Sequence, residues 1–137
     1  MRRVIFRRKR LPPELQGPFV VFHSVLAQVE PAKAALTEVM PTTRMPGRSL
    51  PDALLEFEEG LVRGAELMPG WRAHDVESEW AACERGLADA LDRARRFREE
   101  APELGGFEGL IWAVEQLLGP LEPFAEAAER FRELGAR

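Results

Sequence analysis

Apolar residues recur every three or four positions over long stretches of this chain, and this spacing constrains the fold more than any other feature. Because an α-helix turns once every ~3.6 residues, such spacing gathers the apolar side chains on one helical face. Between residues 107 and 131 this apolar spacing continues across Pro120 and Pro123. The residues that carry the two longest stripes are Val76, Trp80, Cys83, Leu87, Ala90, Ala94 and Phe97, followed by Phe107, Leu110, Val114, Leu117, Leu121, Phe124, Ala128 and Phe131.

Two helices are predicted in the first half of the chain. The first is expected over residues 18–40, with a proline in its first turn and a kink or split at Pro31. The second is expected over residues 51–68. Ser49 and Asp52 have the spacing of a capping box, which favours a helix start at this point.

Two further helices are predicted in the second half. The third is expected over residues 75–100, with Asp75 as its N-cap. The fourth is expected to begin at Phe107 and to continue to the end of the chain as one long helix. Since the apolar spacing survives both prolines, we expect a kink beside Gly119 rather than a loop.

These segments predict an all-α fold, an antiparallel bundle of four main helices with a long, proline-kinked last helix. The expected organisation is a basic N-terminal arm and linker over residues 1–17 and a single helical-bundle domain over residues 18–137. A strand pattern occurs in residues 3–7, which have no partner of the same kind in the chain.

Charge and composition narrow the class of protein. The net charge is −4 and the first ten residues carry six cations and no acid, so the remainder carries −10. An acidic body of this kind is not a general polyanion binder. The single cysteine fits a cytoplasmic location, and the apolar runs are too short for a membrane span. Frequent arginine and scarce amides are typical of a GC-rich bacterial genome or of a hot environment.

The basic arm allows several interpretations. It could neutralise nucleic-acid phosphates, with Phe6 stacking on a base, or attract anionic lipid. It could also be a solvated end, or pair as a strand with another subunit. A charge run alone is weak evidence, so the last two are favoured over nucleic acid. The arm residues proposed as interaction candidates are Arg2, Arg3, Arg7 and Arg8.

The segment 41–51 is a candidate anion site. Arginines can clamp a phosphate or carboxylate, and the N-terminus of the following helix favours negative charge. The alternative is a capped loop whose arginines face nearby acids. The residues proposed for an anion are Thr43, Arg44, Arg48 and Ser49.

The segment 68–77 is a candidate protein contact. It places Trp71 and Arg72 together in a turn, and both residue types are favoured at interfaces. The alternative is that the tryptophan folds back as a plug on the end of the bundle.

Small residues form two stripes at helical spacing. Gly60 and Gly64 lie one turn apart, and Gly86 lies between Ala82 and Ala90. A glycine inside a helix costs ~1 kcal/mol relative to alanine, so a structural reason is expected. Close helix contact is favoured over a slot for a flat ligand.

Catalysis has little support in the sequence. The histidines His23 and His74 lie in no metal-binding pattern, and Cys83 falls on an apolar seam, where an inert thiol is expected. Carboxylates on the second and third helices could bind Mg²⁺ in a nucleotide hydrolase, which is the third hypothesis. These carboxylates are Asp52, Glu56, Glu59, Glu77, Glu84 and Asp89.

The sequence therefore predicts a non-catalytic helical bundle that acts by self-association or protein–protein interaction. No cofactor and no metal are expected. A homodimer is expected because the apolar stripes of the last two helices exceed what one hairpin hides. The rival hypothesis is a small-anion or nucleic-acid binding module that uses the 41–51 loop or the arm.

Overall fold

The computed structural model describes residues 10–44 and 46–136, and within these residues the chain forms α-helices, short 3₁₀ turns and no strand. The all-α fold expected from the apolar spacing is confirmed. The strand-like residues 3–7 lie outside the described residues. The α-helices are α1 (Pro13–Thr37), α2 (Leu50–Leu67), α3 (Glu77–Glu100), α4 (Phe107–Leu118) and α5 (Pro123–Ala136). The 3₁₀ turns are η1 (Met68–Trp71), η2 (His74–Val76) and η3 (Gly119–Leu121).

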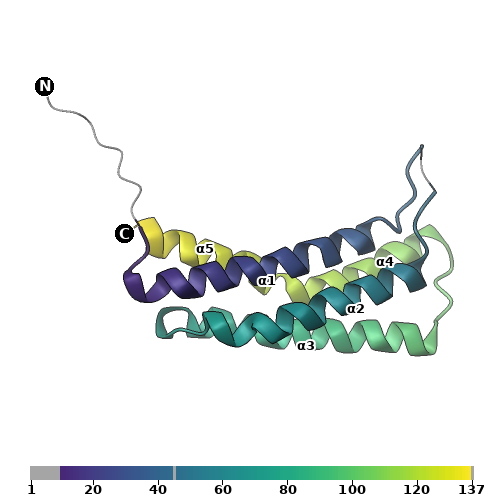
Figure 1. The fold of residues 1–137 in the computed structure, drawn as a ribbon. Coiled ribbons are helices and arrows are strands. Elements are labelled where there is room, and N and C mark those ends of the chain that lie inside the picture. Colours follow the sequence, from purple (N-terminus) through teal and green to yellow (C-terminus); the bar gives the residue numbers. More distant parts are fainter. Residues whose placement is uncertain (1–9, 45, 137) are drawn as a thin grey trace, which may run out of the picture.

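The helices lie side by side in one elongated bundle (Figure 1). The chain reverses between α1 and α2, between α2 and α3 and between α3 and α4, whereas α5 continues in the direction of α4. The connections 38–49 and 101–106 lie at one end of the bundle. The turns η1 and η2 lie at the other end, together with the start of α1 and the end of α5. Residues near the two ends of the described chain are therefore neighbours in space.

The last part of the chain is a bent rod. Instead of the single kinked helix expected, α4 and α5 are separate helices joined by η3. Prolines at 120 and 123 remove two backbone donors, and a 3₁₀ turn closes the gap with a bond from Glu122 N to Gly119 O at 3.2 Å. The apolar register nevertheless continues, because Leu117, Leu121 and Phe124 are all buried.

Helix starts differ from the sequence prediction. The first helix begins at Pro13 and not at residue 18, so part of the expected linker is helical. A proline suits this first position, and the early start buries Leu15. Pro31 lies inside the continuous helix because buried residues on both sides pack against α2. The expected caps are not formed: Ser49 makes no side-chain cap bond, and Asp75 lies in η2.

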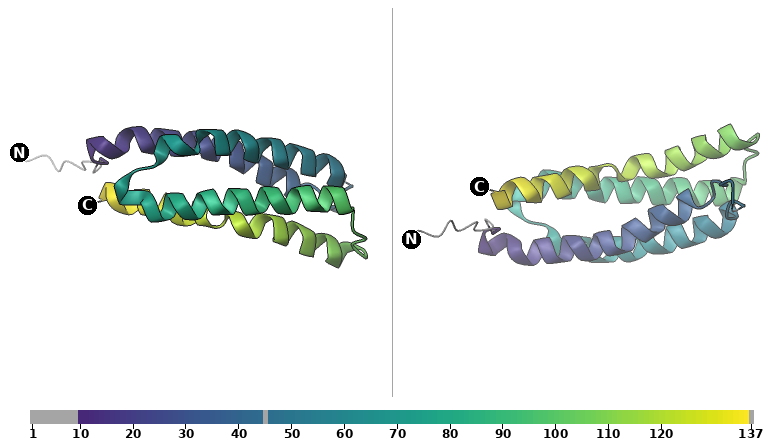
Figure 2. Two further views of the ribbon diagram at one scale, coloured as in Figure 1. Left: turned by 90° about the horizontal axis from the view of Figure 1, so that it is seen from below. Right: turned by 90° about the horizontal axis from the view of Figure 1, so that it is seen from above.

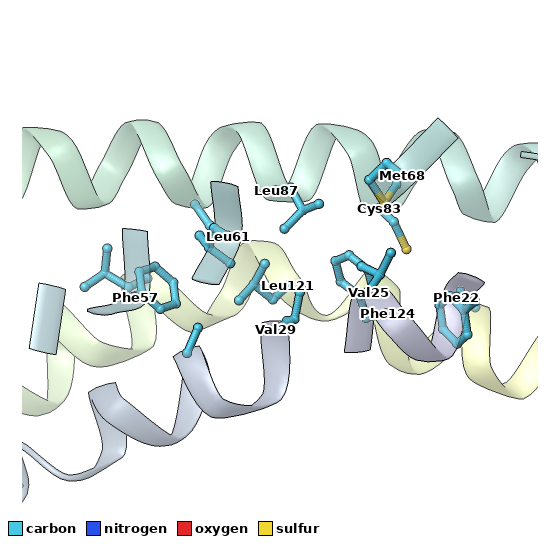
Figure 3. Packing of buried hydrophobic residues seen from close by; sticks show 14 of the residues in the cluster. Phe22, Val25, Val29, Phe57, Leu61, Met68, Cys83, Leu87, Leu121 and Phe124 are labelled. Atoms are coloured by element: carbon cyan, nitrogen blue, oxygen red, sulfur yellow. The ribbon is translucent and has the colours of Figure 1, made fainter. Parts of the chain in front are cut away.

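The core runs the length of the bundle. Figure 3 shows side chains from α1, α2, α3 and the bent rod meeting in one interior. Leu61, Leu87 and Leu121 meet near the middle of the bundle, and Phe22 packs toward the end that holds the termini. Burial of such side chains stabilises the fold by roughly 1.5–3 kcal/mol each.

The glycine stripes mark places where elements approach closely. A Cβ on Gly60 would lie 2.7 Å from the Cβ of Ala32 in α1. A Cβ on Gly86 would lie 2.1 Å from the carbonyl oxygen of Pro120 in η3. Real Cβ atoms do not come this close, so close helix contact is the reason for both glycines.

A buried acid links α2 to α3. Glu58 is 8% exposed. Its carboxylate accepts hydrogen bonds from Arg98 Nε at 2.8 Å and Arg98 Nη2 at 3.1 Å, and Arg95 Nε lies 3.8 Å away. A buried carboxylate is destabilising unless a cation pairs with it, and the bidentate hydrogen bonds from Arg98 supply that pairing. The same hydrogen bonds raise the pKa of the Arg98 guanidinium.

Candidate interaction surface between α1 and α5

The seam between α1 and α5 is the least closely packed of the bundle. Helix α1 packs most extensively on α2, whereas α5 packs on α3. The right view of Figure 2 shows α1 and α5 on the same face of the bundle, separated along their length. Side chains do not fill this seam: a groove of about 1830 Å³ opens between the two helices.

Aromatic rings form the floor of this groove. Phe131 of α5 lies 5.1 Å from Phe22 and 5.4 Å from Phe19, measured between ring centroids. Phe22 in turn contacts Trp71 at 4.9 Å. These distances are those of favourable aromatic pairs, and Phe22 and Phe131 are each only 1% exposed, so the floor belongs to the packed core and Phe19 alone among these rings is half-buried.

The groove is open to solvent along α1. Val20 lines it and is 65% exposed, and Leu11 and Ala128 add further apolar surface. Residues 19–22 are four consecutive apolar positions, which place apolar side chains on more than one side of the helix. Phe22 turns inward, and Val20 is left outside. The α1–α5 groove, defined by Leu11, Phe19, Val20, Ala128 and Phe131, is thus an apolar site that is exposed at Val20, half-buried at Leu11, Phe19 and Ala128, and closed at its base by Phe131.

The polar side chains of the α1–α5 groove are neutral or basic. They belong to Arg10, Gln16, His23 and Arg132, and no Asp or Glu is found among the described lining residues. Arg132 donates to Glu129 one helical turn away, and both are exposed. Exposed pairs of this kind contribute little, so Arg132 can exchange that partner for another anion.

A second, smaller surface lies between α3 and α4. Trp112 is 53% exposed and its ring lies 5.9 Å from that of Phe97, beside a groove of about 440 Å³. Phe107 is exposed as well. Charged residues divide this surface, since Arg93 and Arg96 line it together with Asp89 and Glu100. It is therefore less continuous than the α1–α5 groove.

The predicted anion site is occupied by the protein's own acids. Arg48 Nη2 lies 2.5 Å from Glu56 and Nη1 lies 3.4 Å from Glu38. The hydrogen bond to Glu56 raises the pKa of the Arg48 guanidinium. The other three residues proposed for an anion, Thr43, Arg44 and Ser49, lie in the same connection, at or near its surface. Arg48 therefore anchors the loop, and Glu38 and Glu56 already neutralise its charge. It does not form a free pair of arginines with Arg44 for an anion.

The predicted tryptophan contact faces inward. Trp71 has no exposed surface, and its Nε1 donates to the sulfur of Met68 at 3.2 Å. The side chain plugs the end of the bundle, so the prediction that Trp71 forms a surface contact is wrong. Arg72 stays outside, where it lies 4.5 Å from the Trp80 ring centroid and donates to Glu77 at 2.7 Å. That hydrogen bond lowers the pKa of Glu77.

The carboxylates considered for a hydrolase are dispersed. Glu56 pairs with Arg48, Glu77 with Arg72, and Asp89 with Arg93 at 3.1 Å. Across residues 10–44 and 46–136, no three His, Cys, Asp or Glu side chains are placed to hold a metal ion. Cys83 is fully buried on the apolar seam, where desolvation raises the pKa of its thiol to about 12.

The arm candidates Arg2, Arg3, Arg7 and Arg8 lie outside the described residues. Among the helices of the described ranges, none is long and apolar enough to cross a membrane. The α1–α5 groove was not identified from the sequence. The signal was present in the run Phe19-Val20-Val21-Phe22, which has more apolar positions than one helical face can hide.

No protein-family model matches this chain, and no curated protein or solved structure is significantly similar to it. The function therefore has to be argued from the surfaces of the molecule itself.

Proposed function

We propose that the protein acts by binding another protein through the α1–α5 groove rather than by catalysing a reaction. The observation that carries this proposal is the exposed Val20 beside the half-buried Leu11 and Phe19, above the buried rings of Phe22 and Phe131. Exposed apolar grooves between helices are typical sites for an additional helix. Such a helix would complete the packing that the neighbouring seams of the bundle already have.

A second copy of the chain is one partner to consider. In a symmetric dimer the same surface meets itself. A groove-to-groove contact would place Arg10 and Arg132 of both copies in one interface, with no acid among the described lining residues to pair with them. Like charges at an interface cost free energy, so a partner with a different surface is favoured over the homodimer expected from the sequence.

Site-specific crosslinking tests the proposal. The photoreactive residue benzoylphenylalanine would replace Val20, and in a matched control it would replace Leu55, an exposed leucine on α2. We expect discrete adducts in cells from position 20 and none of the same kind from position 55. Equal adducts from both positions, or none from position 20, would contradict the proposal. Light scattering on the purified full chain then shows whether a second copy accounts for the adduct.

A further inference from the structure

We infer that the partner segment held in the α1–α5 groove is an acidic amphipathic helix. The inference rests on the proposed function and names the chemistry of the partner. It starts from the charge of the lining: the charged residues are Arg10 and Arg132, in a chain whose net charge is −4. A cationic, apolar groove on an acidic molecule selects a partner that is both apolar and anionic.

The apolar part of the partner follows from the floor. Phe19 is half-buried above the buried rings of Phe22 and Phe131, and Val20 beside it is 65% exposed. Apolar side chains spaced three and four apart on a partner helix match such a floor. The groove is bordered by α5, whose 14 residues correspond to ~21 Å at ~1.5 Å per residue. A partner helix of three to four turns is therefore the expected length.

The acidic part follows from where the arginines lie. Arg10 precedes α1, at the end of the groove that holds the termini, and Arg132 lies midway along the α5 lining, between Ala128 and Ala136. Arg132 is 71% exposed at its side chain and is held by an exposed Glu129. A partner carboxylate can take the place of Glu129 at little cost. We therefore place the acids of the partner along the half of the groove between Arg132 and the termini.

Other occupants fit less well. A second copy would add two further arginines to the interface and, among the described lining residues, no acid. The basic arm of the chain itself would also fit poorly as an occupant. It carries five cations before Arg10 and no acid, so its charge has the same sign as that of the groove. An anionic lipid surface shares the required charge, but it needs a convex or flat contact, whereas Val20 and the rings line a groove between two helices. Peptides and vesicles of defined charge separate these cases.

Fluorescence anisotropy with designed peptides provides the test, using the full chain. The acidic peptide has fourteen residues, to match α5, with Leu and Phe at helical spacing and Glu on the flanking positions. A basic peptide carries Lys at every Glu position, and a scrambled peptide keeps the acidic composition without an apolar face. Vesicles of phosphatidylglycerol and of phosphatidylcholine form a separate arm.

We expect the acidic peptide to bind at least about tenfold more tightly than the basic or scrambled peptide, because like charges oppose the basic one. Val20→Glu should weaken binding about tenfold or more by placing a carboxylate in the groove. Arg132→Glu should also weaken it. The matched controls Leu55→Glu and Arg85→Glu, at exposed positions on other helices and outside both grooves, should leave it unchanged. Equal melting temperatures would show that the variants fold.

The remaining outcomes overturn the inference in distinguishable ways. If both charged peptides bind equally and Val20→Glu weakens both, the groove binds helices and the acidic specificity is wrong. If no peptide binds while position 20 still gives a discrete crosslink, the proposed function stands and the acidic helix is wrong. If neither occurs, both are wrong. Binding to phosphatidylglycerol vesicles without peptide binding would assign the groove to a lipid surface.

Discussion

Gly86 shows how a single missing methyl group sets the position of a whole element. Its place on α3 leaves room for the carbonyl oxygen of Pro120, which a Cβ would meet at 2.1 Å. Backbone atoms cannot swing aside as a side chain can. Gly86→Ala should therefore destabilise the fold by ~1–3 kcal/mol, the range for overpacking, despite the better helix propensity of alanine. Thermal and urea unfolding followed by circular dichroism would measure the change.

Gly119 provides the matched control for this prediction. It has helical backbone angles, φ −52° and ψ −45°, and apart from its chain neighbours and its own helix no atom lies within 4 Å of the position that a Cβ would take. Gly119→Ala should destabilise the fold less than Gly86→Ala, because only the ring of the following Pro120 disfavours a Cβ at these angles. A comparable loss of stability in both variants would show that steric contact with η3 is not the reason for Gly86.

Cys83 should behave as an inert core thiol. Burial raises its pKa to about 12, whereas an unfolded cysteine ionises near about 8.5. The folded state therefore keeps its proton over this range while the unfolded state loses it. Stability contributed by the thiol is complete below the unfolded pKa and falls as pH rises toward the folded one.

Alkylation measures this difference directly. At mildly alkaline pH, iodoacetamide should modify Cys83 slowly in the native protein and rapidly in urea, since only the thiolate reacts. The modification rate should follow the fraction unfolded across the denaturation curve. Fast alkylation without denaturant would show that the seam around Cys83 opens far more easily than its burial implies.

At the scale of elements, the apolar spacing predicted which segments are helical but not where they begin. Spacing reports the buried face, and Leu61, Leu87 and Leu121 all point inward as their positions require. Starts depend on local hydrogen bonds, where alternatives differ by ~1 kcal/mol. Ser49 has a good capping side chain that makes no such bond, and α1 begins before the proline that suited a first turn.

The connection between α1 and α2 owes its form to Arg48. Its backbone N donates to Glu38 O at 2.8 Å, and its guanidinium joins Glu38 to Glu56 across the loop. Arg48→Met should free this connection and increase its cleavage by thermolysin under native conditions. Arg44→Met, an exposed position in the same loop, should leave the cleavage rate unchanged. Mass spectrometry would locate the cut, and equal rates in both variants would exclude an anchoring role for Arg48.

The same contact bears on the predicted anion site. The sequence indicates that arginines precede a helix N-terminus, but it does not indicate which acids reach them. Glu38 is ten positions before Arg48 and Glu56 lies on the next helix, so their convergence follows only from the folded loop. Phosphate should therefore give no rise in melting temperature that depends on Arg48.

At the scale of the whole molecule, the candidate surface depends on which helices become neighbours. The chain places Phe19 and Phe131 far apart in sequence, and nothing in either helix alone indicates that they face each other. The sequence predicts an apolar excess on the last two helices, and Trp112 is exposed there while Phe124 is buried. The larger groove, between the first helix and the last, is not indicated by that pattern.

Positive charge is concentrated in the first ten residues, whereas the rest of the chain is acidic. This distribution should affect the association rate of an acidic partner. Six cations occupy the first ten residues, and the last of them, Arg10, lines the α1–α5 groove. Removing residues 1–9 should lower the association rate of the acidic peptide several-fold near 0.01 M salt, where the Debye length is ~30 Å. The dissociation rate should change little, because the rings and Arg132 remain.

Salt separates this steering effect from direct contact. Near 1 M salt the Debye length falls to ~3 Å, so the full and truncated chains should associate at the same rate. Stopped-flow anisotropy would measure both rates. A faster dissociation of the truncated chain at every salt concentration would mean instead that residues 1–9 contact the peptide themselves. The arm would then be part of the binding site rather than a source of long-range attraction.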